Sequence, residues 1–226
     1  MGQQTIKVTV DAIVFGYKPR EGISVLLVKR KYPPYQGEWA IPGGFVRDDE
    51  PLEQAVAREL REETGLETNY LEQLYTFGAP ERDPRERIIS VAYYGLVRPG
   101  KYQLKADSDA DDAQWFDIDH LPSLAFDHQK ILETAVHRLR AKITYEPVGF
   151  ELLDEKFPFS DLEELYTTLL GREIDRRNFR KKILSLGVLD ELKEKRSLGA
   201  GRPATLFRFN KKRYFKLKEK GTMFEV

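Results

Sequence analysis

The sequence of 226 residues contains no cysteine and only three histidines. Without cysteine the chain can form neither a disulfide framework nor a cysteine-based zinc site. The histidines, His120, His128 and His137, are scattered and lack the spacing of metal ligands. A zinc site of either kind is therefore not expected.

Long apolar runs are missing as well. Met1 is not followed by the hydrophobic core of a signal peptide, and no apolar run approaches the roughly 20 residues of a membrane span. A myristoylation signal fails because Ile6 stands where serine or threonine is required. We therefore expect a cytoplasmic protein without membrane contact, with room for one large domain or for a medium and a small one.

The most informative segment runs from Gly44 to Leu66 and reads GFVRDDEPLEQAVARELREETGL. Within it, Glu59, Glu62 and Glu63 fall at positions i, i+3 and i+4, which a helix places on one face. Three like charges so close together repel each other unless a cation lies between them. Mg²⁺ or Mn²⁺ takes carboxylate oxygens and leaves coordination positions for phosphate and water. The alternative is a solvated acidic helix face.

Local signals predict a loop followed by a helix in this segment. Pro51 is typical of a first helical position, and Gly65 is typical of the residue that ends a helix. The apolar residues of the helix form one stripe, namely Leu52, Ala55, Val56 and Leu60. Upstream, Gly43 and Gly44 lie in a flexible turn whose backbone can approach a ligand closely, so both are candidate ligand-binding residues.

The segment is identified as a complete Nudix box, and roughly the first 145 residues resemble a Nudix hydrolase. The resemblance implies an α/β/α sandwich with a mixed sheet, and a substrate in which a nucleoside diphosphate is linked to another group. It implies that Glu59 and Glu63 are the principal metal ligands and that Glu62 is a further ligand or a base. Arg58 would orient a glutamate of the box. Catalysis would be metal-assisted attack on phosphorus.

A charged loop, residues 80–87, supplies further candidates for ligand binding. Its arginines, Arg82, Arg85 and Arg87, have the fork geometry that recognises phosphate or carboxylate groups. The alternative is a solvated loop with local ion pairs. Aromatic residues able to stack a base are Trp39, Tyr93, Tyr94 and Trp115, although core packing explains most such residues. The sequence does not single out the aromatic residue that holds a ligand ring.

Around the box the chain alternates between strand and helix patterns. Strands are predicted at residues 5–15, 24–30, 70–77, 87–97 and 113–118, and a helix at residues 127–142. The clearest boundary signal is the segment Glu-Pro-Val-Gly at residues 146–149. We therefore predict a Nudix domain over residues 1–146 and a second domain over residues 147–226.

The net charge of zero hides a strong segregation of charge along the chain. Residues 171–220 hold 17 basic and 6 acidic residues, a balance of +11, whereas residues 1–170 hold 20 basic and 30 acidic residues, a balance of −10. This asymmetry indicates an acidic domain joined to one that binds a polyanion. A basic surface that only aids solubility is the alternative.

The basic region has the pattern of a winged helix-turn-helix. A first helix is predicted from a capping box, Ser160 with Glu163, to a stop at Gly171. A second helix is expected at about residues 175–186, and strands at 188–193 and 204–209 enclose a basic loop, the wing. Candidate DNA-binding residues are Arg176, Arg177, Asn178, Arg180 and Lys181 on the second helix and Arg202 in the wing, where an arginine suits a narrow minor groove.

Over essentially its whole length the chain resembles the Nudix-related transcriptional regulators of NAD metabolism, through the box, the segment IDRRNFRKKILSLG and the wing sequence GRPATLFRF. The resemblance implies a homodimeric repressor that binds operator DNA and responds to ADP-ribose or a related metabolite. Some members have a degraded box and no catalysis, whereas every key position is intact here, so Mg²⁺-dependent hydrolysis stays open. Two alternatives are an ADP-ribose pyrophosphatase without a DNA role, and a basic domain that binds RNA or a protein.

Overall fold

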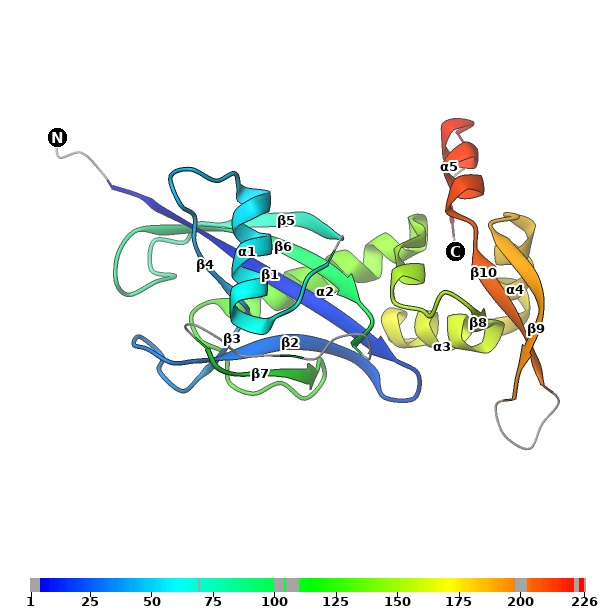
Figure 1. Cartoon of the computed structure of the whole chain (residues 1–226), viewed down its shortest axis with the longest axis horizontal. Coiled ribbons are helices and arrows are strands. Elements are labelled where there is room, and N and C mark those ends of the chain that lie inside the picture. The colour runs from blue at the N-terminus through cyan, green and yellow to red at the C-terminus, as the bar shows by residue number, and fades with distance from the viewer. Residues whose placement is uncertain are drawn as a thin grey trace. The chain divides into compact units, whose positions relative to one another are not determined.

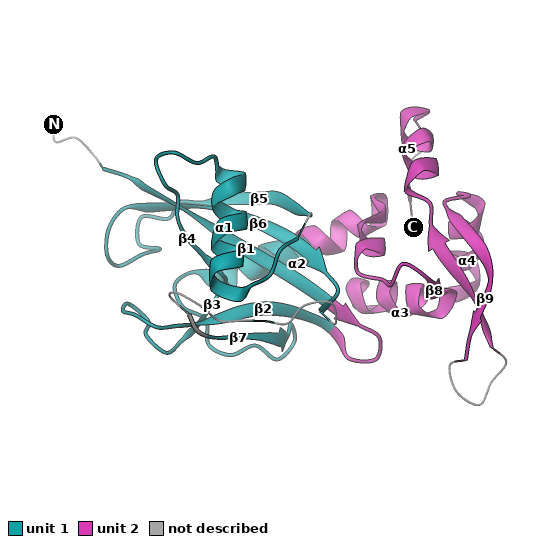
Figure 2. Cartoon of the chain, viewed as in Figure 1, with its two compact units in different colours: residues 1–16, 23–137 teal, residues 17–22, 138–226 magenta. Residues whose placement is uncertain are grey.

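The computed structural model describes residues 5–68, 70–99, 104, 110–197, 203–221 and 224–225. The chain forms two compact units, Met1–Gly16 with Ile23–His137 and Tyr17–Gly22 with Arg138–Val226 (Figure 2). The first unit contains the box, and the second contains the basic region. The division between the units falls inside a helix, and the domain boundary predicted between residues 146 and 147 stays a prediction.

The first unit is built on a mixed sheet with a helix on each face (Figure 1). Its elements are β1 (Lys7–Lys18), β2 (Gly22–Arg30), β3 (Trp39–Ala40), β4 (Gly43–Phe45), α1 (Leu52–Thr64), β5 (Leu71–Phe77), β6 (Ile88–Val97), β7 (Ala110–Asp117) and α2 (His128–Tyr145), of which β1 and α2 continue into the second unit. The strand order is β3-β2-β1-β6-β5, with β4 also paired to β1 and β7 to β2. β1 runs parallel to β6 and antiparallel to β4, so the predicted mixed sheet is confirmed.

Helix α1 covers one face of the sheet because its predicted apolar stripe is buried. Ala55, Val56 and Leu60 pack into one core cluster with side chains of β1 and β6. The helix ends at Gly65, which adopts the left-handed conformation (φ 68°), as predicted. Pro51 precedes the helix as its N-cap instead of occupying the first helical position. The other face is covered by the first part of α2 (Figure 1), in which Ile131, Leu132 and Ala135 are buried.

The longer elements predicted for this unit are confirmed, with ends that differ by a few residues. β1, β2, β5, β6, β7 and α2 each cover the greater part of a predicted range. The short strands β3 and β4 were not predicted, because two or three residues carry no readable periodicity. Within the described ranges, no helix has both the length and the apolar composition needed to cross a membrane.

The second unit has the predicted winged helix-turn-helix, with additions at both ends. Its own elements are a 3-10 helix (Pro147–Glu151), β8 (Phe157–Pro158), α3 (Phe159–Leu170), α4 (Arg176–Ser185), β9 (Leu189–Arg196), β10 (Ala204–Phe209) and α5 (Lys211–Glu219). α3 and α4 are the predicted helix pair, and β9 and β10 are the strands of the predicted wing. β10 pairs antiparallel with both β8 and β9. The 3-10 helix, β8 and α5 were not predicted.

The predicted capping box at Ser160 is wrong. α3 begins at Phe159 with Pro158 as its N-cap, and no side chain caps it. Ser160 lies inside the first turn, where its hydroxyl donates to Asp161 Oδ1 at 3.4 Å. Pro158 is held by its pairing with β10, so the chain turns into the helix before the serine is reached. The predicted stop at Gly171, in the left-handed conformation (φ 63°), is confirmed.

Aromatic side chains join the elements of the second unit. Phe159 of α3 lies 6.1 Å from Phe179 of α4 and 5.7 Å from Phe207 of β10, measured between ring centroids. The fully buried ring of Tyr166 lies 4.9 Å from that of Phe179. These contacts fix α4 against α3 by its apolar side, so the charged side of α4 faces outward.

The hydroxyl of Tyr166 generates a stability prediction. It is buried and has no hydrogen-bond partner among the residues that the structure describes, a condition that costs about 1–3 kcal/mol. We therefore expect Tyr166→Phe to raise the free energy of unfolding by about 1 kcal/mol. Tyr166→Ala should lower it by about 3–5 kcal/mol, because it leaves a cavity. Urea denaturation of the full chain checks both values, and a Tyr166→Phe variant less stable than the wild type would contradict the interpretation.

Candidate functional site

The site is organised by the close approach of β4 to its neighbours on both sides. A Cβ atom at Gly44 would lie 2.5 Å from Cδ of Glu59, and one at Gly43 would lie 2.2 Å from the carbonyl oxygen of Val10. Position 43 therefore requires glycine, because backbone blocks a side chain there, whereas a side chain at Gly44 would displace the Glu59 carboxylate. The backbone N–H of Gly43 donates to Glu63 Oε2 at 2.9 Å. Gly43 and Gly44 were expected in a flexible turn, but they are the first two residues of β4. We call residues 41–44, which join β3 to β4, the glycine turn. Two of the three box glutamates meet this segment.

Arg58 lies among the acidic side chains of the box. Its Nε and Nη2 donate to the carboxylate of Glu50 at 2.9 and 2.5 Å. Its Nη1 donates to Glu59 Oε1 at 2.6 Å and to Glu62 Oε2 at 3.1 Å. The hydrogen bonds from Arg58 lower the pKa of Glu50 to about 2, and the bond with Glu50 is the main reason why the pKa of Arg58 is raised. The structure therefore gives one arginine three carboxylate partners.

The three box glutamates differ in their surroundings. The Glu59 side chain is 14% exposed, and burial raises the pKa of its carboxyl against the opposing effect of Arg58. Glu63 is buried at the glycine turn. Glu62 is 36% exposed and faces Arg58 and Arg47, the latter at 3.6 Å. The structure brings Glu59 and Glu63 to the turn and leaves Glu62 nearer the solvent.

The carboxylates of Glu59 and Glu63 suit a hard divalent cation, whose charge would offset the burial that raises the Glu59 pKa. As the side chains stand, no three His, Asp or Glu residues of the described part surround one metal position. Arg58 supplies positive charge to Glu59 and Glu62 instead. A cation held by all three predicted ligands, Glu59, Glu62 and Glu63, would share the carboxylates of Glu59 and Glu62 with Arg58, which bonds one oxygen of each.

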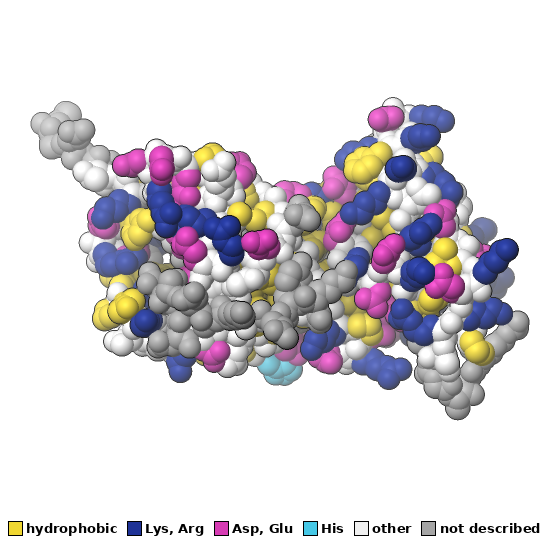
Figure 3. Space-filling view, in the orientation of Figure 1, with side chains coloured by type: hydrophobic (Ala, Val, Ile, Leu, Met, Phe, Trp, Pro, Cys, Tyr) yellow, Lys and Arg dark blue, Asp and Glu magenta, His cyan; other side chains and the backbone are white. Residues whose placement is uncertain are grey.

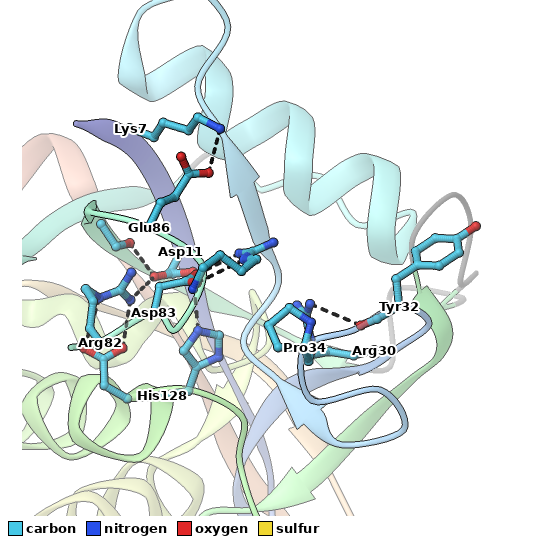
Figure 4. Close-up of polar contacts among 12 residues, drawn as sticks. Lys7, Asp11, Arg30, Tyr32, Pro34, Arg82, Asp83, Glu86 and His128 are labelled. Atoms are coloured by element: carbon cyan, nitrogen blue, oxygen red, sulfur yellow. Dashed lines mark hydrogen bonds and ion pairs between the residues drawn. The ribbon is translucent and has the colours of Figure 1, made fainter. Parts of the chain in front are cut away.

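A buried polar network lies beside the same turn (Figure 4). Asp11 of β1 accepts a hydrogen bond from Ser90 and lies 3.7 Å from Arg82 Nη2. Arg82 donates to both carboxylate oxygens of Asp127, at 3.1 and 2.8 Å. His128 Nε2 lies 3.8 Å from Asp11 Oδ1. We call Asp11, Arg82, Ser90, Asp127 and His128 the buried network.

His128 links the buried network to the glycine turn. The backbone N–H of Ile41 donates to His128 Nδ1 at 2.9 Å, so the ring proton belongs on Nε2, which faces Asp11. Burial lowers the pKa of His128, although Asp11 and Asp127 oppose this shift, and the ring is therefore neutral. Of the buried network, only Arg82 was a candidate from the sequence, and Asp11, Ser90, Asp127 and His128 were not predicted as site residues. The available signal was Asp11, a charge that interrupts the apolar run from Val10 to Phe15.

The three loop arginines proposed as ligand-binding residues have different environments. Arg82 belongs to the buried network, and its side chain is only 4% exposed. Arg85 donates to both carboxylate oxygens of Asp83, at 3.0 and 2.7 Å, and is 39% exposed. Arg87 donates to the carbonyl oxygen of Ala79 at 3.1 Å. Of the three, Arg85 presents the most accessible guanidinium, and Arg82 is committed to its carboxylate partners.

In the second unit, Lys and Arg side chains are spread over the visible face (Figure 3). The predicted DNA-binding side chains of α4 are all exposed, namely Arg176, Arg177, Asn178, Arg180 and Lys181. Asn178 also bonds to the N-cap residue Asp175, through its backbone N–H at 3.1 Å and its amide at 2.6 Å. The Arg180 guanidinium lies 4.3 Å from the ring centroid of Phe159. These two side chains therefore also serve the packing of the unit. Arg202 lies outside the described residues.

Two family models match the chain, one on each side of its division. A model of the NUDIX domain matches residues 5–137. A model described as the NrtR DNA-binding winged helix domain matches residues 149–209. The first match covers the sheet, the box and the buried network, and the second covers the helix pair and the wing.

Curated relatives share either both parts or the first alone. The ADPR responsive transcriptional repressor NtrR of Acinetobacter baylyi is 32% identical over 205 residues, which cover 89% of this chain and 81% of the relative. The ADP-ribose pyrophosphatase of Methanocaldococcus jannaschii is 44% identical over 126 residues, which cover 56% of this chain and 70% of that enzyme. The similarity over the full architecture is thus to a repressor.

Two solved structures of Shewanella oneidensis NrtR are similar to this chain. The crystal structure of that protein complexed with a 27mer DNA has a TM-score of 0.75 and 34% identity, and the alignment covers 89% of this chain and 93% of that chain. Its NUDIX domain complexed with ADP ribose has a TM-score of 0.54 and 38% identity, over 62% of this chain and 90% of that chain. The alignment with the DNA complex covers most of the chain, whereas the alignment with the isolated NUDIX domain covers less than two thirds of it.

The neutral state of His128 predicts a pH dependence of stability. Burial holds its pKa below the unfolded value of about 6.5, so below about pH 6.5 the unfolded chain takes up a proton that the folded chain does not. The free energy of unfolding should therefore fall as the pH drops below about 6.5. His128→Asn keeps an acceptor for the Ile41 N–H but cannot titrate, so its stability should fall less between about pH 7 and about pH 5. Urea denaturation of the wild type and the variant at both pH values measures the difference. An equal fall in the free energy of unfolding of the two proteins would contradict the prediction.

Proposed function

Because the chain belongs to the Nudix family and continues into an NrtR DNA-binding winged helix domain, we propose that it is a transcriptional repressor that releases operator DNA when its Nudix domain binds ADP-ribose. It is a homologue of an ADPR responsive transcriptional repressor. The observation that carries the proposal is the combination of an intact box at a glycine turn with a basic, exposed recognition helix in one chain. Such a regulator acts in the cytoplasm as a homodimer, each α4 reading one half-site.

The DNA-binding surface is assigned to α4 and the wing. In a helix-turn-helix the N-terminal residues of the second helix contact base edges in the major groove. In this chain those residues include Arg176 and Arg177, both exposed, with Lys181 one turn further along. The solved complex of the S. oneidensis relative with DNA supports this assignment.

The ligand is assigned to the glycine turn and the box. A pyrophosphate group carries negative charge, which the carboxylates of Glu59 and Glu63 would repel without a cation between them. Mg²⁺ or Mn²⁺ on these residues, with Glu62 as a further ligand, supplies that charge. The NUDIX domain of the S. oneidensis relative in complex with ADP ribose supports the choice of effector.

Two elements provide a covalent connection between the ligand site and the helix pair. β1 carries Asp11 in the first unit and ends in the second, where the backbone N–H of Arg20 donates to Glu164 of α3. α2 begins at His128 and passes into the second unit, where Arg140 Nε donates to the carbonyl oxygen of Leu169 at 3.0 Å. A change in the buried network is therefore expected to reach α3 through both elements.

The proposal predicts that ADP-ribose and operator DNA bind with opposed affinities. We expect ADP-ribose to lower the affinity for operator DNA by about 5- to 150-fold, a coupling of about 1–3 kcal/mol. Operator DNA should lower the affinity for ADP-ribose by the same factor. Calorimetry on the full chain, with duplexes from its own promoter, measures both affinities. The Glu63→Gln variant keeps an acceptor for the Gly43 N–H and prevents consumption of the ligand.

An alteration confined to the DNA surface serves as the control for this experiment. Arg177→Ala should weaken operator binding by about 1–3 kcal/mol if Arg177 reads a base edge, and should leave ADP-ribose affinity in the absence of DNA unchanged. Equal ADP-ribose affinity with and without operator would refute the switch. The absence of any shift of promoter DNA at low salt, where counterion release favours binding, would refute the DNA role.

A second activity, metal-dependent hydrolysis of ADP-ribose, is favoured by the intact box and by the 44% identity to an ADP-ribose pyrophosphatase. In that case the protein destroys the molecule to which it responds, so the response ends by itself. Arg58, Glu59, Glu62 and Glu63 are the residues to which we assign this chemistry. Positioning and charge neutralisation at the pyrophosphate would supply most of the rate.

Removing one carboxylate tests this activity. We expect Glu59→Gln to lower the affinity for Mn²⁺, measured by calorimetry, and to abolish the release of AMP from ADP-ribose. The thermal stability should not fall, because the substitution relieves repulsion among buried acids. A wild-type chain that releases no AMP with either Mg²⁺ or Mn²⁺ would leave sensing as the only function of the domain.

A further inference from the structure

Three aromatic rings lie beside the glycine turn without being buried. Tyr35 and Phe45 are 38% and 39% exposed, and Phe126 is half-buried. The rings of Tyr35 and Phe126 meet edge to face with centroids 4.8 Å apart. Two guanidinium groups accompany them. Arg30 lies 4.7 Å from the Phe126 ring centroid, and Arg85 lies 5.7 Å from it and 5.6 Å from that of Phe45. We call these five residues the aromatic platform.

The backbone of the platform is held in an uncommon conformation. Three non-glycine residues of the described part have a positive φ, and two of them are Tyr35 (φ 60°) and Phe126 (φ 54°). Bulky side chains adopt this conformation at a cost that the surrounding structure must offset, and such residues concentrate at ligand sites. Here the two strained residues are in contact with each other, so the strain places two rings side by side.

The platform borders the ligand site at both ends. Phe45 follows Gly44, the residue that meets the carboxylate of Glu59. Phe126 precedes Asp127 and His128, and His128 accepts the N–H of Ile41 in the same turn. A ligand whose phosphates lie at the box therefore has an aromatic surface within the same unit.

The chemistry of the platform suits a flat, uncharged ring joined to phosphate. Purine bases stack on aromatic rings and on guanidinium planes. Arg85 is fixed by its two bonds to Asp83, and Arg30 donates to the carbonyl oxygens of Pro34 and Tyr32, so both guanidinium groups are held in place. The positive charge of the two guanidinium groups also attracts the phosphate groups attached to a nucleoside.

The aromatic residues considered from the sequence fit this role less well. Tyr93 and Tyr94 are buried in the core of the first unit, Trp115 packs against that core, and Trp39 packs against Phe116. None of these side chains combines exposure with a flanking guanidinium group, as Phe126 does. We propose that the aromatic platform is the subsite that stacks the adenine ring of a nucleoside diphosphate, and this deepens the proposed function by naming how ADP-ribose is recognised.

The proposal is tested on the full chain by calorimetry with three probes, namely ADP-ribose, ADP and inorganic pyrophosphate. Phe126→Leu keeps an apolar side chain but removes the aromatic face. It should lower the affinities for ADP-ribose and for ADP by about tenfold to a hundredfold, the loss expected when one aromatic–base stack is removed. The affinity for pyrophosphate should not change. The control is Tyr75→Leu, which removes a more exposed ring of β5 outside the platform and should change none of the three affinities.

The outcomes distinguish this proposal from the proposed function. If the wild type binds ADP-ribose and Phe126→Leu binds it equally well, the platform is structural and the subsite is overturned, while the repressor stands. If ADP binding depends on Phe126 but no nucleotide changes operator affinity, the subsite stands and the switch falls. A wild type that binds neither ADP-ribose nor ADP overturns the subsite. If Phe126→Leu lowers the Tm, Phe45→Leu, which alters an exposed ring, gives the decisive measurement.

Discussion

The close approach of β4 to α1 is the constraint on which the rest of the ligand site depends. A side chain at Gly44 would displace the carboxylate of Glu59, one at Gly43 would meet the backbone of Val10, and the N–H of Gly43 is bonded to Glu63. Behind the turn, His128 holds the N–H of Ile41. The turn is therefore fixed from both sides, by the carboxylates of the box and by the buried network. A displacement of β4 has to move one of them.

Arg58 determines how charge is balanced at this turn. Three carboxylates accept hydrogen bonds from one guanidinium, which spares the helix the repulsion that its own sequence creates. A cation at the box would share the carboxylates of Glu59 and Glu62 with Arg58, which bonds one oxygen of each. Filling the site would therefore change the balance of charge beside α1.

The segregation of charge limits each function to its own part of the chain. The negative balance of residues 1–170, which include the whole mixed sheet, disfavours contact of the sheet with DNA, and the positive balance of residues 171–220 favours contact of α4 and the wing with DNA. α4 maintains this separation locally. It buries Phe179 and Ile183 against the unit and exposes its basic side chains. β1 and α2, which contribute to both units, are the elements through which the two functions can influence each other.

The sequence by itself determined the box helix, the helix pair and the wing, because these depend on residues a few positions apart, and the metal-binding role of the box helix remains a prediction of the same pattern. The spacing of Glu59, Glu62 and Glu63, and the left-handed glycines at 65 and 171, are signals of that range. Only the tertiary structure decided which polar side chains become partners. Arg82 meets Asp127 across 45 residues, and His128 meets Ile41 across 87. Even the start of α3 was decided by the pairing of β8 with β10, which overrode the local capping signal of Ser160. The aromatic platform likewise exists because folding brings Tyr35, Phe45 and Phe126 together, and no local pattern records contacts between segments so far apart in the chain.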